Sequence, residues 1–263
     1  MIGVFDSGVG GLAVFRELDR SLPDADILYF SDSACFPYGS RPSGWLKERT
    51  SAITRAFLER GCSLVVLACN TATVVAIESL RRDFPETPFV GVVPPVKVAS
   101  SLKPQKKIIV LMTENTSAGE KYAELVNNHV SSAAIEEVRL PLLAQVVEDL
   151  SFFEPEVARK AALSVAVLLG GAKPESFRLV LGCTHYVFLT PALKKHLGPG
   201  IEILDPCQAV AAQVARVCKQ HSLPVGQNGT RRFLCTGDPR RFSEQLEALL
   251  GIKNQELEQV ELP

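Results

Sequence analysis

Short apolar runs alternate along the chain with longer segments in which apolar residues recur every three or four positions. In the first part of the chain the runs lie at residues 2–5, 27–30, 64–67 and 89–93, and a segment with helical spacing covers residues 45–59. Short, almost wholly apolar runs are typical of strands buried on both faces, and their alternation with helices indicates a parallel sheet. The pattern therefore predicts an α/β fold.

The same series of elements begins again after residue 93. Apolar runs at residues 108–111, 135–140, 179–181 and 201–204 follow in the same order and at near-constant spacing, with a helical segment at 157–169. Short apolar runs are common, so chance similarity is the alternative to a duplication. We interpret the pattern as two similar parallel-sheet α/β domains related by pseudo-symmetry, with the active site in the cleft between them.

The C-terminal segment has no counterpart in either series. Its pattern predicts a helix at 208–218, a strand at 232–234 and a helix at 242–250. We expect this segment to pack on the first unit. Proline-bearing turns at residues 94–95 and 205–206 mark the crossings between units. The predicted domains are therefore residues 1–94 with 207–263, and residues 95–206.

Composition and charge exclude several classes of partner. Apolar residues make up 46% of the chain and charged residues 22%, and 28 Lys and Arg against 29 Asp and Glu give a net charge of -1. This balance argues against a nucleic-acid-binding surface and gives no attraction to anionic membranes. No apolar run reaches the roughly 18 residues of a membrane span, and the N-terminal residues lack an export-signal pattern. We expect a soluble cytoplasmic protein.

The cysteine pattern favours free thiols. The chain has seven cysteines, an odd number, with scattered spacing and without a Cys-x-x-Cys pair. In a reducing compartment this pattern is typical neither of a disulfide framework nor of a zinc site. His129, His196 and His221 lie in polar or helical surroundings and are expected at the surface, so no metal site is predicted. For five of the cysteines we expect a packing role: Cys35, Cys62, Cys207, Cys218 and Cys235.

The other two cysteines lie where ligands bind in parallel sheets. Cys69 follows the run at 64–67, and Cys183 follows the run at 179–181. Each is followed by small polar residues, Asn70 and Thr71 in the first case and Thr184 in the second. Because ligands bind beyond the carboxyl ends of parallel strands, we expect the two thiols to face each other across one cleft.

Two opposed thiols suit the inversion of a stereocentre. Inversion removes a proton from one side of a carbon and returns a proton on the other, and each cysteine can act as base or acid. Asp6 is the natural partner of Cys69, and His185 can hold or relay the proton of Cys183. Both cysteines precede predicted helices, the second with Thr190 as its cap, whose amides would lower the thiol pKa values and bind carboxylates.

The glycine-rich loop at residues 6–11 (DSGVGG) allows a different hypothesis, a phosphate site. Its glycine spacing does not fit a dinucleotide site, and it lacks the Lys-Ser/Thr ending of a nucleotide loop. We expect its glycines to let backbone amides approach a carboxylate. No predicted strand end offers a lysine for a pyridoxal Schiff base, so we expect no cofactor.

Six motifs together resemble the aspartate/glutamate racemase family over nearly the whole chain. The sequence reads FDSGVGGL at 5–12, PYG at 37–39, ACNTAT at 68–73, GVVPP at 91–95, LGCTHY at 181–186 and TGDP at 236–239. Aspartate-specific members share the CNT element but usually lack DSGVGG and PYG. The resemblance therefore implies the glutamate-specific, cofactor-independent branch, which supplies D-glutamate for peptidoglycan.

The resemblance also implies roles for individual residues. Cys69 and Cys183 would be the two acid/base residues, with Asp6 assisting the first and His185 and Glu148 assisting the second. Glutamate would be the small-molecule partner, and a homodimer stays open. The residues implied in binding the ammonium and carboxylates of the substrate are Ser7, Tyr38, Gly39, Asn70, Thr71 and Thr184.

Two segments depart from the family pattern. Met112 and Gly119 replace the usual alanine and serine of the segment after the fifth strand, and Val187 replaces a proline. Neither change affects a thiol, so we expect an effect on substrate affinity or loop shape. The alternatives are a racemase of aspartate or another amino acid, and a non-catalytic amino-acid-binding protein on the same scaffold.

Overall fold

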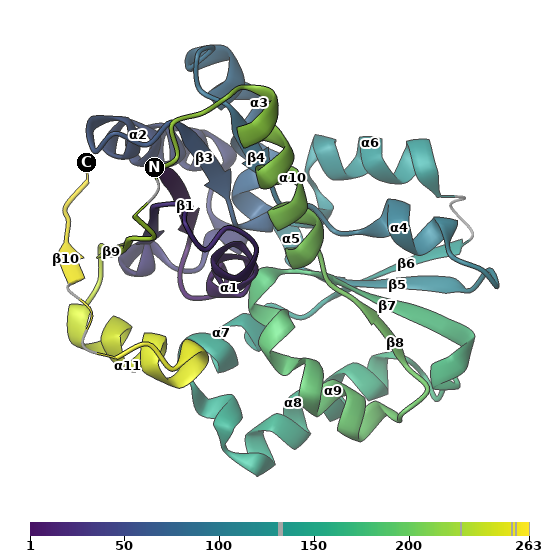
Figure 1. The fold of residues 1–263 in the computed structure, drawn as a ribbon. Helices are drawn as coiled ribbons and strands as arrows, with labels where there is room; N and C mark the ends of the chain where they lie inside the picture. The colour runs from purple at the N-terminus through teal and green to yellow at the C-terminus, as the bar shows by residue number, and fades with distance from the viewer. Residues whose placement is uncertain (131–133, 227, 254, 256, 263) are drawn as a thin grey trace.

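Two parallel sheets, each covered by helices, form the molecule (Figure 1). The computed structural model describes residues 1–130, 134–226, 228–253, 255 and 257–262. Every pair of neighbouring strands in both sheets is parallel. The predicted α/β class with two parallel-sheet units is confirmed.

The first sheet has six strands in the order β10-β9-β2-β1-β3-β4. Its strands are β1 (Ile2–Asp6), β2 (Ile27–Ser31), β3 (Leu64–Leu67), β4 (Phe89–Gly91), β9 (Arg231–Cys235) and β10 (Leu257–Gln259). All residues of β1, β2 and β3 are buried, as expected for strands covered on both faces.

The second sheet has four strands in the order β6-β5-β7-β8. Its strands are β5 (Lys107–Met112), β6 (Ile135–Arg139), β7 (Phe177–Gly182) and β8 (Glu202–Leu204). This order is the same as that of β2-β1-β3-β4 in the first sheet. The apolar runs that correspond between the two series in the sequence therefore form strands at equivalent places in the two sheets. Strands β3 and β7 correspond in this way.

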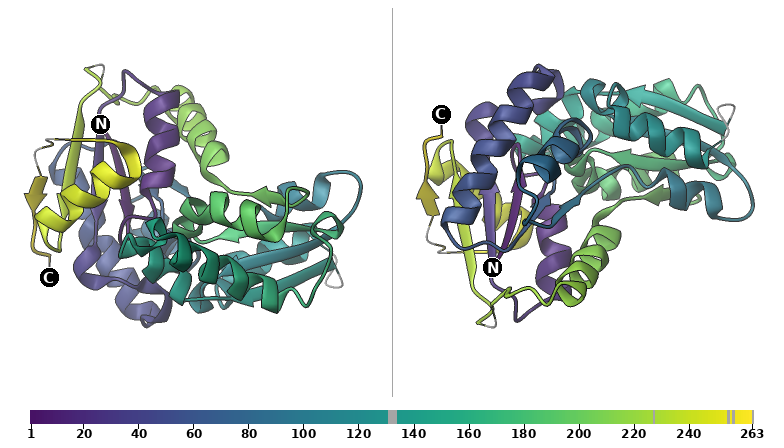
Figure 2. Two further views of the ribbon diagram at one scale, coloured as in Figure 1. Left: turned by 90° about the horizontal axis from the view of Figure 1, so that it is seen from below. Right: turned by 90° about the horizontal axis from the view of Figure 1, so that it is seen from above.

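The C-terminal segment extends the first sheet at the edge formed by β2. Strand β9 pairs with β2, and β10 pairs with β9. Helix α10 (Cys207–Gln220) packs beside α1 (Leu12–Ser21), as both views in Figure 2 show, and the two chain ends lie on the same side of the molecule. The pattern did not predict β10, because its three residues, Leu-Glu-Gln, are mostly polar. The boundaries of the two domains stay a prediction.

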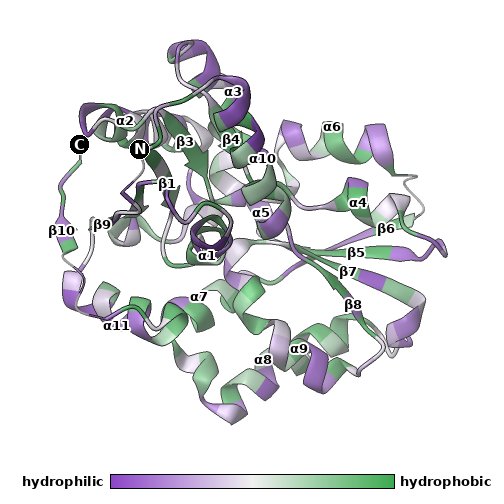
Figure 3. Ribbon diagram, in the orientation of Figure 1, coloured by the Kyte–Doolittle hydropathy of each residue, from purple (hydrophilic) through white to green (hydrophobic). Residues whose placement is uncertain are grey.

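Helices of varied length connect the strands and cover both faces of each sheet. Hydrophilic residues recur along the helices, whereas the strands between them are mostly apolar (Figure 3). The remaining α-helices are α2 (Ser43–Glu59), α3 (Asn70–Asp83), α4 (Val96–Ser101), α5 (Glu114–Ser117), α6 (Glu120–His129), α7 (Leu142–Glu148), α8 (Pro155–Leu168), α9 (Thr190–Leu197) and α11 (Pro239–Leu250). In the described part of the chain, every helix is too short or too polar to cross a membrane.

Short 3-10 helices lie in several of the connections between these elements. They are η1 (Ser33–Cys35), η2 (Tyr38–Ser40), η4 (Ser151–Phe153), η5 (Pro174–Ser176) and η6 (Thr184–Leu189). Helix η6 runs directly into α9, whose first residue is Thr190. The expectation that Thr190 caps this helix is wrong, since Leu189 precedes the helix and no side chain caps it.

Candidate active site

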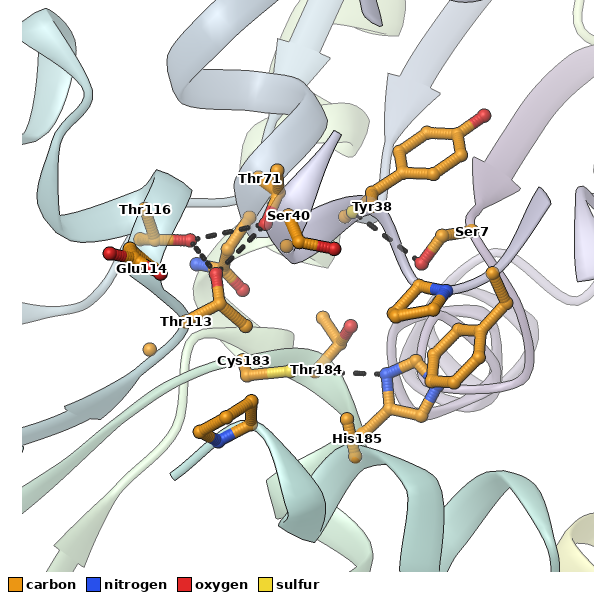
Figure 4. A pocket seen from close by; sticks show the side chains of 18 of the residues that line it. Ser7, Tyr38, Ser40, Thr71, Thr113, Glu114, Thr116, Cys183, Thr184 and His185 are labelled. Atoms are coloured by element: carbon orange, nitrogen blue, oxygen red, sulfur yellow. Dashed lines mark hydrogen bonds between the residues drawn. The ribbon is translucent and has the colours of Figure 1, made fainter. Parts of the chain in front are cut away.

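A cavity of about 270 Å³ lies where the carboxyl ends of strands from both sheets meet (Figure 4). It brings together ten of the eleven predicted site residues, which are Asp6, Ser7, Tyr38, Gly39, Cys69, Asn70, Thr71, Cys183, Thr184 and His185. The eleventh, Glu148, lies behind His185 and does not line the cavity. The cavity is therefore built from residues that are far apart in sequence and belong to both sheets.

Cys69 lies at the junction between β3 and α3. Its backbone is still extended, the helix starts at the next residue, and its side chain is 5% exposed. The sulfur lies 3.9 Å from Ser7 Oγ. Burial raises the pKa of Cys69 well above its usual value, and the charge of Asp6 raises it further, while the Ala72 amide acts in the opposite direction. The helix amide of Ala72 therefore acts in the predicted direction, but burial outweighs it and the pKa of Cys69 is raised.

Asp6 ends β1 and is fully buried. Its Oδ2 accepts a hydrogen bond of 2.8 Å from the Gly11 amide and lies 4.0 Å from Nδ1 of His185, and its Oδ1 has no partner among the described residues. Burial raises the pKa of Asp6, although the charge of His185 and the Gly11 amide act to lower it. The glycine loop does bring an amide to a carboxylate, but the carboxylate belongs to the protein itself.

Cys183 lies at the matching junction after β7, with its side chain 7% exposed. Its sulfur is 3.9 Å from Nδ1 of His185, whose Nε2 is 2.9 Å from Oε2 of Glu148. Because Nε2 faces a carboxylate, it carries a proton, and Nδ1 is the nitrogen that faces the thiol. Burial acts to lower the pKa of His185, but hydrogen bonds to Cys183 and Glu148 and the charge of Asp6 raise it well above its usual value.

Glu148, the last residue of α7, is held by three parts of the chain. Besides His185, its Oε2 accepts a hydrogen bond of 3.0 Å from the amide of Val9 in the glycine loop. The buried amide of Gln245 in α11 donates to the Glu148 carbonyl at 2.7 Å. Residue separations of 139 and 97 explain why no local pattern indicated this arrangement.

Three threonine hydroxyls form a polar wall of the cavity. Thr71 Oγ1 lies 3.0 Å from Thr113 Oγ1 and 3.4 Å from Thr116 Oγ1, and the last two lie 2.9 Å apart. Residues 113–116 follow β5 and belong to the strand ends at which the sequence predicts ligand binding, but Thr113 and Thr116 were assigned no individual role. The other lining residues to which the sequence assigned no role are Phe36, Pro37, Ser40, Glu114, Arg139, Pro141, Ala144 and Gly182.

Asn70 carries an unpaired amide at the cavity. Its side-chain nitrogen and oxygen are both buried, and neither has a hydrogen-bond partner among the described residues. Buried polar groups in proteins are almost always paired, so an orphaned amide in a cavity wall indicates a polar ligand. The amide can both donate to a carboxylate and accept from an ammonium.

The remaining cysteines and histidines form no second centre in the described residues. All seven cysteines are free thiols, and among the described residues no group of three or more metal-binding side chains is arranged to hold an ion. Burial raises the pKa of Cys62 to about 11. Such a thiol behaves as a small apolar side chain.

Comparison with known proteins gives consistent matches. The Asp/Glu/Hydantoin racemase family matches residues 2–214. A glutamate racemase of Roseiflexus sp. (strain RS-1) is 38% identical over 251 residues, which cover 94% of this chain and 91% of the relative. The crystal structure of Escherichia coli glutamate racemase with L-glutamate and the activator UDP-MurNAc-ala has a TM-score of 0.87 at 31% identity, covering 100% of this chain and 98% of that one. Glutamate racemase from Thermus thermophilus, in complex with beta-chloro-D-alanine, has a TM-score of 0.80 at 34% identity and covers 98% and 96% of the two chains.

Proposed function

Because the chain belongs to the Asp/Glu/hydantoin racemase family, we propose that it interconverts L-glutamate and D-glutamate by proton transfer between two cysteines. The observation that carries this proposal is the placement of Cys69 and Cys183. They follow equivalent strands of two sheets with the same strand order, and both line one cavity. The substrate assignment rests on relatives named glutamate racemase.

In the reaction, one cysteine thiolate removes the α-proton of glutamate, so that the C–H bond breaks and an S–H bond forms. The opposite thiol then delivers its proton to the other face of the same carbon, which restores a C–H bond with inverted configuration. The enzyme is left with the thiol and thiolate exchanged, ready for the other enantiomer. Two positioned groups at hydrogen-bond distance supply both the proton transfer and the correct geometry.

The site must favour the thiolate when substrate is bound. Burial and the nearby Asp6 raise the pKa of Cys69, so this thiol is mostly protonated in the free enzyme. The ammonium group of a bound amino acid would offset that cost, because a cation within about 4–6 Å favours the charged form of an acid. We assign Asp6 to the Cys69 side and His185, held by Glu148, to the Cys183 side.

Substrate binding is assigned to the polar cavity wall. Ser7, Asn70, Thr71 and Thr184 offer hydroxyl and amide groups for the ammonium and carboxylates. The Tyr38 ring points away from the cavity (Figure 4), and its hydroxyl donates to Asp32. We therefore assign Tyr38, like Gly39, to substrate binding through its backbone.

The proposal extends to the cellular role. The reaction would supply D-glutamate for peptidoglycan synthesis in the cytoplasm, with glutamate as the partner of the site. We also propose the domain division into residues 1–94 with 207–263 and residues 95–206. A homodimer is the assembly to test, by measuring the particle mass in solution.

Incubation with L-glutamate in D₂O tests the proposed function. Optical rotation should fall to zero, and mass spectrometry should find one α-deuterium in each inverted molecule. L-aspartate serves as the comparison substrate and should react far more slowly. Faster inversion of aspartate would overturn the substrate assignment, and binding of glutamate without exchange would overturn the reaction.

A further inference from the structure

The short helix η2 at the cavity belongs to the half of the molecule with the first sheet, but it is held by a side chain from the half with the second sheet. The amide nitrogen of Asn115 lies 3.0 Å from the Tyr38 carbonyl oxygen and 2.9 Å from the Arg41 carbonyl oxygen. Helix η2 follows β2 of the first sheet, whereas Asn115 lies in α5, which follows β5 of the second sheet. The two hydrogen bonds therefore cross from one half of the molecule to the other.

The two carbonyls are well suited to this amide. The Tyr38 carbonyl belongs to the first residue of a three-residue helix and also accepts the Arg41 amide at 3.1 Å, while the Arg41 carbonyl follows the last residue of that helix. A carboxamide carries two N–H donors on one nitrogen, and here each is directed to one carbonyl. Asn115 thus joins the first carbonyl of the turn to the last with one side chain, and the Tyr38 carbonyl uses its second lone pair for this bond.

The same segment is anchored on its other side within the first sheet. The Tyr38 hydroxyl donates to Oδ2 of Asp32, which is fully buried. Asp32 also accepts hydrogen bonds of 2.9 and 2.8 Å from the Arg49 guanidinium and one of 2.8 Å from Thr236. The side chain of Tyr38 is fixed by one half of the molecule, and its carbonyl by the other.

This segment forms part of the cavity wall, but Asn115 does not. Pro37, Tyr38, Gly39 and Ser40 line the cavity. A Cβ atom on Gly39 would lie 3.2 Å from Cβ of Thr113, so the segment packs closely against the second half. Any effect of Asn115 on a bound ligand therefore passes through the position of residues 38–41.

We propose that Asn115 is a positioning residue that holds residues 38–41 over the glutamate site when the two halves of the molecule are closed. This inference rests on the proposed racemase function and adds a residue to it. Both cysteines are almost fully buried, and we infer that the halves separate for substrate to bind and for product to leave. Opening breaks the two hydrogen bonds of Asn115, and closing restores them together with the cavity wall.

The variant Asn115→Asp tests the inference with almost no change of shape. It replaces the two donors by a carboxylate oxygen that faces two carbonyl oxygens. We expect KM to rise about tenfold for L-glutamate and for D-glutamate, equivalent to about 1.4 kcal/mol, with both kcat values within about twofold of the wild type. Asn115→Ala removes the donors without adding repulsion and should have a smaller effect in the same direction.

Asn127→Asp is the matched control, because Asn127 is exposed on α6 and the substitution changes the net charge equally. It should leave both KM values unchanged. Hydrogen-exchange mass spectrometry supplies a readout independent of turnover: backbone amides of residues 38–41 should exchange faster in Asn115→Asp than in the wild type or the control.

Three outcomes would overturn the inference. They are unchanged KM values in Asn115→Asp, unchanged exchange at residues 38–41, and a loss confined to kcat in one direction, which would indicate action through one cysteine. A wild-type protein that fails to racemise glutamate would instead contradict the proposed function, so the two failures are distinguishable.

Discussion

The surroundings of Cys69 and Cys183, the two cysteines that line the cavity, differ far more than their backbones do. Both residues are extended and follow a buried strand, with φ and ψ of -113° and 120° for Cys69 and -143° and 133° for Cys183. Beyond Cys69 a fourteen-residue α-helix begins, whereas beyond Cys183 a six-residue 3-10 helix precedes α9. Cys69 lies near a hydroxyl and the carboxylate of Asp6, and Cys183 lies near the imidazole of His185.

The glycine loop of the first half serves both cysteines. Its Gly11 amide binds Asp6, and its Val9 amide binds Glu148. A Cβ on Gly8 would lie 2.3 Å from Glu148 Oε2, and one on Gly10 would lie 2.2 Å from His185 Nδ1. Repetition of the fold thus places the two thiols, but a single unrepeated loop arranges the groups that support them.

Replacement of either thiol should have the largest effect. A serine hydroxyl is a much weaker acid than a thiol, so Cys69→Ser and Cys183→Ser should each lower the racemisation rate at least about a thousandfold, within the range for loss of a general acid or base. Each variant should still exchange the α-proton of the enantiomer that faces its remaining thiol, as followed by NMR in D₂O. Cys218→Ser, on the half-buried thiol of α10, is the control and should retain full activity. Full activity in either site variant would refute the paired-thiol assignment.

Substitution of Glu148 should separate the two sides of the site. Glu148→Gln removes the carboxylate that holds Nε2 of His185, and we expect kcat to fall about tenfold to a hundredfold, or about 1.4–2.8 kcal/mol. Proton transfer at Cys183 then becomes the slow step in both directions. With α-deuterated substrate, the isotope effect on kcat should rise for the enantiomer deprotonated by Cys183 and approach one for the other.

The control for this comparison is Glu154→Gln, since Glu154 is an exposed glutamate shortly after α7. It should leave both isotope effects unchanged. If Glu148→Gln changes the isotope effect on kcat equally for the two enantiomers of α-deuterated glutamate, Glu148 does not act on the Cys183 side alone.

The pH dependence of stability should show the smallest difference. The pKa of His185 is raised in the folded protein, so its stabilising contribution is complete below about pH 6.5 and is lost as pH rises through the folded-state pKa. The Tm of the wild type should therefore fall more between pH 6.5 and 9 than that of His185→Asn, by on the order of 2–4 °C for a change of about 1 kcal/mol. Parallel Tm curves for the wild type and His185→Asn would contradict a raised pKa of His185.

The buried Asp6 also has a raised pKa, so its stabilising contribution is lost from about pH 4 upward. The Tm of Asp6→Asn should therefore change less with pH than that of the wild type in this lower pH range.

The sequence predicted those features that depend on local pattern. Apolar runs located the strands because burial on both faces leaves a continuous apolar segment, and the strand ends then located Cys69, Cys183 and Thr184. The order of the runs also predicted the repeated sheet, which the shared strand order confirms.

Features that depend on packing between distant segments were not predictable in this way. The helical pattern around Glu148 resembles any amphipathic helix, so only the family resemblance indicated this residue. The bond from Asn115 to the Tyr38 carbonyl joins residues 77 positions apart and requires the two halves to be in place. The raised pKa of Cys69 likewise follows from burial in the folded protein, which no local motif reports.

The bond from Gln245 to Glu148 has a consequence for synthesis of the protein. Helix α11 lies close to the C-terminal end of this chain, yet it supports the carboxylate that orients His185. A ribosome releases residue 245 long after both cysteines have emerged. In the nascent polypeptide both thiols therefore precede the glutamine that holds Glu148, and the arrangement around His185 forms only after α11 has emerged and packed against Glu148.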